Sequence, residues 1–309
     1  MATPEFRVIR LHTRYRRDLT EERTREKQRV EKLLESAGIK LSGVLPDLHG
    51  VSGRDIMGHL IAGERDPRAL AQLARRRARA KIPRLEEALD GTEFFTAEHA
   101  ALLDAMLRRI DAQNAGIDRI SVVIEELLAP WEEQLQQAEP MPGWRRRAAQ
   151  DVLAEIGPDM TRFATPGHLV SWAGRAPLDH QSGQRKGRGK RKKGNRYIGA
   201  ATGETSVSAG RTQTREGARY RRLARRIGKD KAQVAVSNTQ LKVYHKLLSS
   251  PGTRYQDLGA AYYEKQAQAR RKNRYHLAEL DALGYDVIIT PRPGPDPGDA
   301  ARGKQTAAA

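Results

Sequence analysis

Apolar residues recur at helical spacing through most of the chain. Residues 7–37 predict one highly charged helix that Gly38 ends. Its sparse apolar stripe consists of Leu19, Val30, Leu33 and Leu34. Opposite charges in ERTREKQRVEK stand at helical spacing and can pair along the helix surface. A short helical region with several glycines follows, in which Ser52 is expected to cap a helix that runs through Leu60.

A second helical stretch covers residues 66–138. Its apolar positions alternate steps of three and four, which predicts a coiled-coil seam or a helical hairpin, and the break at residues 91–96 would turn the chain between two arms. An ordinary helical bundle would show the same spacing. In either case the segment is typical of a scaffold or dimer arm. The stripes are Leu70, Leu73, Ile82, Leu85 and Leu89, and then Leu102, Leu103, Met106, Leu107, Ile110, Ile117, Ile120, Val123, Ile124, Leu127 and Leu128.

The sequence pattern changes after Pro140, where long helical stripes give way to short elements and a basic stretch. The run MPGWRRRAAQDVLAEIGPDMTRF predicts a turn, a helix and a stop at residues 157–158, followed by the apolar element HLVSWAGRAP and a long basic stretch. Helix returns over residues 200–248, whereas the Pro-, Gly- and Ala-rich residues after Pro291 predict a disordered tail. The expected core of the last helical region is Leu223, Ile227, Val234, Val236, Leu241, Val243, Leu247 and Leu248.

Composition supports a mainly α fold and indicates an anionic partner. The 309 residues suffice for two or three compact units, and the 5% aromatic content argues against a large β-sandwich. Lys and Arg number 56 against 38 Asp and Glu, giving a net charge of +18. Such a chain favours a polyanion, of which nucleic acid is the usual one and an anionic membrane surface the alternative.

Several classes of site are disfavoured by the sequence. The chain has no cysteine, so disulfides, thiol catalysis and Cys-based zinc sites are excluded. Its eight histidines show no metal-ligand spacing, and neither a Walker loop nor a dinucleotide fingerprint is present. No stretch has the length of a membrane span or the apolar core of a signal peptide, so we expect a cytoplasmic protein without a membrane partner.

The turn at Pro142 and Gly143 is the first candidate contact with nucleic acid. With the helix that follows, it resembles a helix-hairpin-helix element, in which a glycine turn brings backbone N–H groups and a helix N-terminus close to a phosphate. The usual second glycine is replaced by Arg145, and Arg145, Arg146 and Arg147 are expected to contact phosphate. A simple turn at the start of a helix is the alternative.

A basic segment is the second candidate. Seven of the nine residues from 185 to 193 are Lys or Arg, and the interspersed glycines allow the backbone to approach phosphates closely. A solvated loop or a localisation tract is the alternative, but such charge density beside a core favours contact with nucleic acid. The candidate residues are Gly183, Arg185, Lys186, Arg188, Lys190, Arg191, Lys192, Lys193, Asn195 and Arg196.

Ser182 is the candidate catalytic residue. A serine hydroxyl needs a base, a metal or nearby cations to become a nucleophile. Gly183 would let a phosphodiester approach, and the cations that follow could stabilise charge on phosphorus. Taken on residue types alone, most Ser-Gly pairs are turns.

Four runs of sequence, in order, resemble the IS110/IS116 family of insertion-sequence transposases. They are TRYRRDLTEERTREKQRVEKLLESAGIKL, MPGWRRRAAQDVLAEIGPDMTRF, HLVSWAGRAPLDHQSGQRKGRGKRKKGNRYI and YRRLARRIGKDKAQVAVSNTQLKVYHKLL. The resemblance covers residues 12–290. It implies DNA transposition directed by a structured guide RNA, with a serine nucleophile that joins covalently to DNA. That serine falls on Ser182, with Ser171 as the fallback, and the basic segment would contact DNA or the guide RNA.

One part of the family plan has no counterpart in the sequence. Family members carry an N-terminal RuvC-like domain whose DEDD carboxylates bind magnesium, whereas Asp18, Glu21 and Glu22 lie in a charged helix and do not fit those roles. We therefore expect a truncated, catalytically incomplete copy or a gene read from a late start codon. No cofactor is expected on this chain, because Mg²⁺ would come only with the acidic domain.

These observations predict four regions. A helical remnant occupies residues 1–63, a coiled-coil helical hairpin arm residues 64–139, a compact helical C-terminal transposase domain residues 140–290, and a disordered tail residues 291–309. The expected partners are DNA, a structured guide RNA and a second copy of the chain joined through the coiled coil. Two alternatives stay open: a non-catalytic helix-hairpin-helix protein that binds nucleic acid, and a coiled-coil adaptor that does not.

Overall fold

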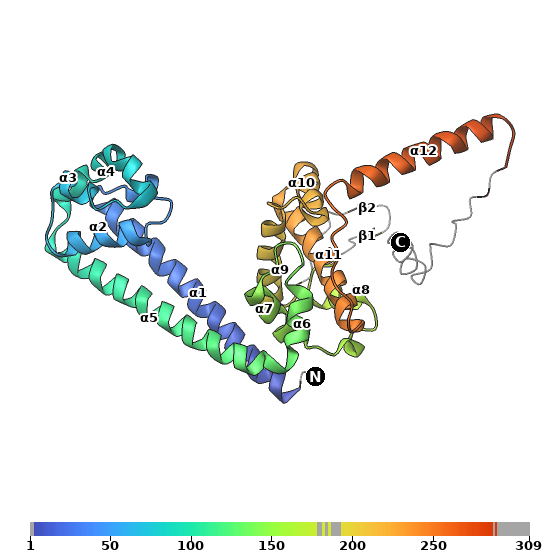
Figure 1. Ribbon diagram of the computed structural model, residues 1–309, viewed down its shortest axis with the longest axis horizontal. Coiled ribbons are helices and arrows are strands. Elements are labelled where there is room, and N and C mark those ends of the chain that lie inside the picture. Colours follow the sequence, from blue (N-terminus) through green and yellow to red (C-terminus); the bar gives the residue numbers. More distant parts are fainter. Residues whose placement is uncertain (1–2, 178–180, 183–184, 187–192, 287, 289–309) are drawn as a thin grey trace, which may run out of the picture.

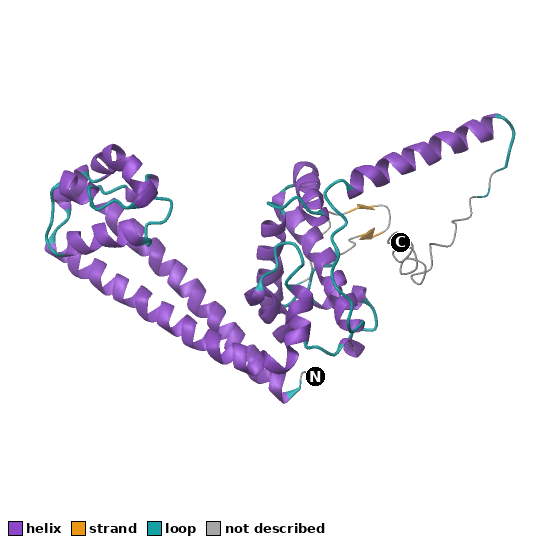
Figure 2. Cartoon of the chain, in the orientation of Figure 1, coloured by secondary structure: helices purple, strands orange, loops and turns teal. Residues whose placement is uncertain are grey.

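The computed structural model describes residues 3–177, 181–182, 185–186, 193–286 and 288, and for 181–182 and 185–186 it describes the backbone alone. Helices dominate the described residues, which confirms the predicted mainly α fold (Figure 2). None of the described helices is long and apolar enough to cross a membrane. The predicted tail after Pro291 lies outside the described residues.

Two long antiparallel helices form an arm (Figure 1). Helix α1 spans Pro4–Ser36 and α5 spans Ala97–Leu128. Thr3 caps α1, and Thr96 with His99 forms a capping box at the start of α5. Gly38, at φ +80°, follows the end of α1 as the sequence predicts. The face of α5 that is buried along its length consists of Leu103, Leu107, Ile110, Gln113, Ile117, Ile124 and Leu128.

The arm pairs differently from the sequence-based expectation. We expected residues 64–139 to form a hairpin by themselves, but the partner of α5 is α1. Residues 66–94 contain Pro67, Pro83 and Gly91 and form only short helices, which are too short to pair with the 32 residues of α5. The 33-residue α1 has the required length. The coiled-coil prediction is not confirmed.

The short helices form a cluster at the tip of the arm. They are η1 (Leu41–Gly43), α2 (Val51–Ile61), α3 (Pro67–Ala71), η2 (Arg76–Lys81), α4 (Ile82–Ala88) and η3 (Asp90–Phe94). Their own hydrophobic core includes Ile39, Ile56, Leu70, Leu85 and Phe95. The prediction that Ser52 caps α2 is wrong, because Gly50 is the N-cap residue and the Ser52 Oγ accepts a hydrogen bond from the Arg75 backbone N–H at 2.9 Å.

A second body of helices packs against the base of the arm. Its elements are η4 (Ala129–Trp131), α6 (Glu132–Ala138), α7 (Arg146–Ile156), η5 (Met160–Arg162), α8 (Pro166–Trp172), α9 (Arg196–Ala209), α10 (Arg215–Ile227) and α11 (Lys229–Ser249). Tyr244 is fully buried, and its ring centroid lies 5.0 Å from that of Trp144. Phe6 and Ile9 of α1 belong to the same core, so the arm and this body share apolar contacts at their junction.

Two features extend from this body. The two-residue strands β1 (Gln181–Ser182) and β2 (Arg185–Lys186) pair antiparallel, with Ser182 opposite Arg185. Helix α12 (Tyr262–Ala282) projects away from the other helices and has no buried residue (Figure 1). Among the predicted core residues of α10 and α11, Leu223, Val236, Leu241 and Leu247 are buried, whereas Ile227 is 36% exposed.

Candidate nucleic-acid interface

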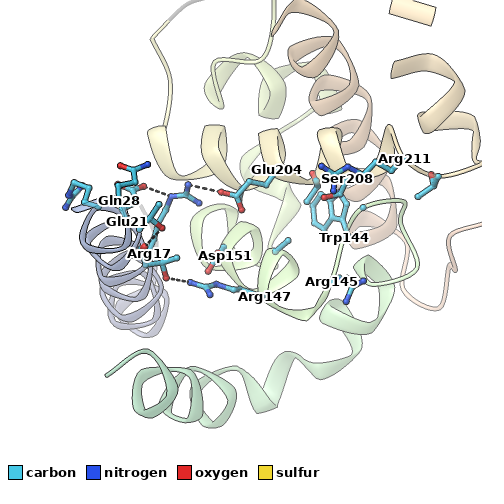
Figure 3. Close-up of a pocket in the computed structure, with 18 residues that line it drawn as sticks. Arg17, Glu21, Gln28, Trp144, Arg145, Arg147, Asp151, Glu204, Ser208 and Arg211 are labelled. Atoms are coloured by element: carbon cyan, nitrogen blue, oxygen red, sulfur yellow. Dashed lines mark hydrogen bonds and ion pairs between the residues drawn. The ribbon is translucent and has the colours of Figure 1, made fainter. Parts of the chain in front are cut away.

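A cleft of about 890 Å³ lies between α1, the turn before α7, and α9 (Figure 3). Its lining residues include five arginines and three carboxylates. The arginines are Arg17, Arg25, Arg145, Arg147 and Arg211, and the carboxylates are Glu21, Asp151 and Glu204. The cleft therefore joins residues that lie up to about 195 positions apart in the sequence, since Thr212 lines it together with Arg17.

Buried Glu155 on α7 holds α1 and α9 together at one edge of this region. Its carboxylate accepts hydrogen bonds from Arg14 Nε at 2.6 Å and from Arg14 Nη2 at 2.9 Å. Asn195 Nδ2 donates to the same carboxylate at 2.5 Å, and the Asn195 side chain also accepts the backbone N–H of Tyr197 as the N-cap of α9. Arg10 donates to the backbone carbonyls of Ala154 and Glu155. Helix α1 is thus docked on α7 mainly through charged hydrogen bonds.

A second ion-pair cluster lies one helical turn further along α1. The Arg16 guanidinium is buried and donates to Gln150 at 2.8 Å and to Asp151 at 2.7 Å. Burial raises the pKa of Asp151, and the nearby positive charge of Arg16 opposes that rise. Arg17 bridges from α1 to α9 by pairing with Glu21 and Glu204, each at 3.0 Å. These pairs fix one wall of the cleft.

The turn before α7 is seated on α9 rather than open to solvent. Gly143 has φ +80°, and a Cβ atom there would lie 2.0 Å from the carbonyl oxygen of Thr205. Gln240 Nε2 donates to the Pro142 carbonyl at 2.9 Å, while its Oε1 accepts the hydroxyls of Thr205 and Ser206. The glycine predicted to admit a phosphate is therefore required for packing against α9. A helix-hairpin-helix element is not confirmed.

The three consecutive arginines have three different environments. Arg145 is exposed, occupies the N-cap of α7 and lines the cleft. Arg146 donates to Glu125, Glu132 and Glu139, and these carboxylates raise the pKa of its guanidinium far above the usual value. Arg147 is half-buried and donates to Thr20 Oγ1 at 2.6 Å, and this burial lowers its pKa. Within the described residues, Arg145 is the arginine of the three whose guanidinium has no protein acceptor.

The residues that flank the loop with the basic segment, Gly174 and Gly194, lie against each other. A Cβ atom on Gly194 would lie 2.5 Å from the backbone of Gly174, so the chain before and after the segment meets at the base of a loop. Arg175 is buried there, and its guanidinium donates to the Gly199 carbonyl of α9. Asn238 of α11 donates to the Arg175 carbonyl at 3.0 Å. The loop that carries Ser182 is thus anchored on α9 and α11.

The predicted residues of the segment are placed only in part. Gly183, Arg188, Lys190, Arg191 and Lys192 lie outside the described residues, as do the side chains of Ser182, Arg185 and Lys186. Lys193 is exposed at the end of the loop. Arg196 pairs with Asp18 of α1 at 3.2 Å, and its guanidinium lies over the Tyr197 ring.

The fallback serine and several important residues also have defined places. Ser171 is exposed on α8. Sequence reasoning missed Arg17, Glu155, Gln240 and Arg211, because a charged or polar residue inside a helix carries no local signal of a distant partner. The described residues hold no group of three or more His, Cys, Asp or Glu that could bind a metal ion.

One of the comparisons with known proteins gives a match, and it covers part of this region. No curated protein matches the chain. A family model described as Transposase IS116/IS110/IS902 family matches residues 135–221, which run from the middle of α6 through α7, α8, the basic segment and α9 to the middle of α10. The match contains two of the three walls of the cleft and the loop that carries Ser182. Over residues 135–221, the chain is therefore similar to the transposases that this family model describes.

Proposed function

We propose that this chain binds DNA during transposition through the cleft and the adjacent basic segment, which together we call the DNA face. One observation carries the proposal: the family match of residues 135–221 contains three of the five arginines that line the cleft. Sugar–phosphate chains are bound chiefly by such cations and by helix N-termini. A net charge of +18 adds a long-range attraction for DNA.

We assign different roles to the arginines of the cleft. Arg145 stands at the N-terminus of the 11-residue α7, where the helix dipole also favours a phosphate, and Arg211 is exposed just after the end of α9. Arg17 and Arg147 already donate to protein acceptors and mainly shape the wall (Figure 3). Phosphate contacts therefore fall to Arg25 of α1, which is also exposed, to Arg145 and Arg211, and to the loop that follows Ser182.

The resemblance to the family supports a nucleophilic role for Ser182. Its Oγ would attack the phosphorus of a phosphodiester, so that an Oγ–P bond forms while one of the two ester P–O bonds breaks. The released deoxyribose oxygen takes up a proton as the serine loses one. The backbone of Ser182 pairs with that of Arg185 across the two strands. The residue opposite the proposed nucleophile is therefore an arginine.

A covalent adduct tests this role. We expect the full chain to form a denaturation-resistant adduct with duplex DNA that carries a bridging phosphorothiolate, because a thiolate leaves without help from an acid or a metal. Ser171→Ala should form the adduct as the parent does, and Ser182→Ala should lose at least about tenfold of it. An adduct that survives Ser182→Ala would overturn the nucleophile, and DNA binding without any adduct would favour a non-catalytic nucleic-acid-binding protein.

The remaining parts of the proposal concern partners. We propose that complete strand transfer needs an acidic metal-binding set in addition to the described residues. A structured guide RNA is proposed to share the DNA face, which predicts competition between RNA and DNA. Self-association is proposed through the arm, whose α1 exposes Leu11 (67%) and Tyr15 (54%).

A further inference from the structure

A second basic surface lies between α10 and α12 and shares no lining residue with the cleft. Arg222 of α10 and six residues of α12 line a groove of about 430 Å³, which we call the α10–α12 groove. Among these seven described residues four are arginines and none is a carboxylate, whereas the cleft of the DNA face mixes both signs. The arginines are Arg222, Arg270, Arg271 and Arg274.

Tyr263 arranges the cations on the α10 side of this groove. Its hydroxyl accepts hydrogen bonds from Arg215 Nε at 3.5 Å and Arg219 Nη1 at 3.4 Å. The guanidinium carbon of Arg222 lies 4.4 Å from the centre of the Tyr263 ring. Arg215 also lies over the ring of Tyr262, at 5.3 Å. These contacts hold three guanidinium groups together on one face of α10 despite their mutual repulsion.

Helix α12 contacts α10 through Tyr262 and Tyr263 near its N-terminus but buries none of its side chains. None of its 21 residues is buried, so the tertiary packing that supplies most of a helix's stability in proteins contributes little here. Residues 265–274 carry five cations and no carboxylate, so like charges four positions apart, such as Arg270 and Arg274, repel each other. Glu264 is the nearest acid in the chain and lines a neighbouring depression with Arg221 and Arg225. An anionic partner in the groove would remove this repulsion.

We propose that the α10–α12 groove binds the sugar–phosphate backbone of duplex DNA as a contact separate from the DNA face. Arginines already cover the rings of Tyr262 and Tyr263, so these rings are not free to stack on unpaired bases. Phosphates displayed on the outside of a duplex fit a groove lined by guanidinium groups without base-stacking surfaces. The choice of DNA as the partner rests on the proposed function.

We expect neutralisation of charge on the groove face of α12 to weaken DNA binding more than the same neutralisation on the opposite face. Arg270→Gln with Arg274→Gln removes two charges from the groove, and Lys265→Gln with Lys272→Gln removes two from the opposite helix face, which lines neither depression. Equilibrium binding of the full chain to duplex DNA should weaken about tenfold or more for the arginine pair, with the slope of log K against log salt falling by about 1–2. The lysine pair should weaken binding less than about threefold.

Crosslinking locates the contact independently. The chain has no cysteine, so Ala267→Cys in the groove and Ala269→Cys on the opposite face each give one attachment point for a DNA-reactive probe. We expect Ala267→Cys to crosslink duplex DNA at least about fivefold more than Ala269→Cys. Equal crosslinking, equal effects of the two charge pairs, or preferential capture of single-stranded RNA would each overturn the proposal that the α10–α12 groove binds duplex DNA. A parent chain that binds no duplex DNA would instead overturn the proposed function.

Discussion

Glu155→Gln should lower the free energy of unfolding by about 3 kcal/mol, because it removes the charge of a buried carboxylate that joins α1, α7 and α9. Arg14 would lose its bidentate acceptor and Asn195 would face an amide that repeats its own donors. Urea unfolding of the full chain, followed by circular dichroism, measures the change.

Exposed Glu126 on α5 provides the control for the Glu155 change. Glu126→Gln alters the same atoms on a residue that is exposed, so its free energy of unfolding should stay within about 0.5 kcal/mol of the parent. If Glu155→Gln and Glu126→Gln had equal effects, the ion pairs between α1 and α7 would contribute nothing to the attachment of the arm.

Gly143→Ala should destabilise the protein by at least about 3 kcal/mol. The added Cβ would meet the Thr205 carbonyl oxygen at 2.0 Å, and the backbone has φ +80°, which an L-residue with a side chain rarely adopts. The turn cannot retreat easily, because Gln240 holds the Pro142 carbonyl. The same urea titration measures the loss.

Gly228 separates the two causes of the Gly143 effect. Gly228→Ala imposes a similar positive φ of +87° without any neighbour within 4 Å of the new Cβ, so it should cost about 1–3 kcal/mol, less than Gly143→Ala. A Gly143→Ala protein that unfolds at the same urea concentration as Gly228→Ala would show that the turn is not pressed against α9.

Most helices of the fold could be predicted from sequence because their signals are local. The spacing of apolar residues and Gly157, at φ +77°, defined α7, and Gly38 marked the end of α1. The pairing of the arm could not be predicted in this way. Residues 66–94 and α1 both carry helical periodicity, and only their lengths, set by two prolines and a glycine, decide which of them lies along α5.

The candidate site was predictable as a region but not residue by residue. Arg145, Arg146 and Arg147 are three consecutive residues of one type, so sequence alone does not distinguish them. Successive positions on a helix nevertheless point about 100° apart. Arg146 consequently meets carboxylates of α5 and α6, Arg147 meets Thr20 of α1, and Arg145 lines the cleft. Glu155 and Arg14 lie 141 residues apart, and no local pattern encodes that pairing.

Binding of duplex DNA as a function of salt tests the central claim most directly. The parent should show a slope of log K against log salt of about −4 or steeper. Replacing the seven Lys and Arg of residues 185–193 by Gln should reduce that slope by at least about 2 and weaken binding about a hundredfold near 0.1 M salt, with an unchanged circular dichroism spectrum. If the substituted chain bound the duplex as tightly as the parent, with the same slope, the DNA face would not be where this protein holds DNA.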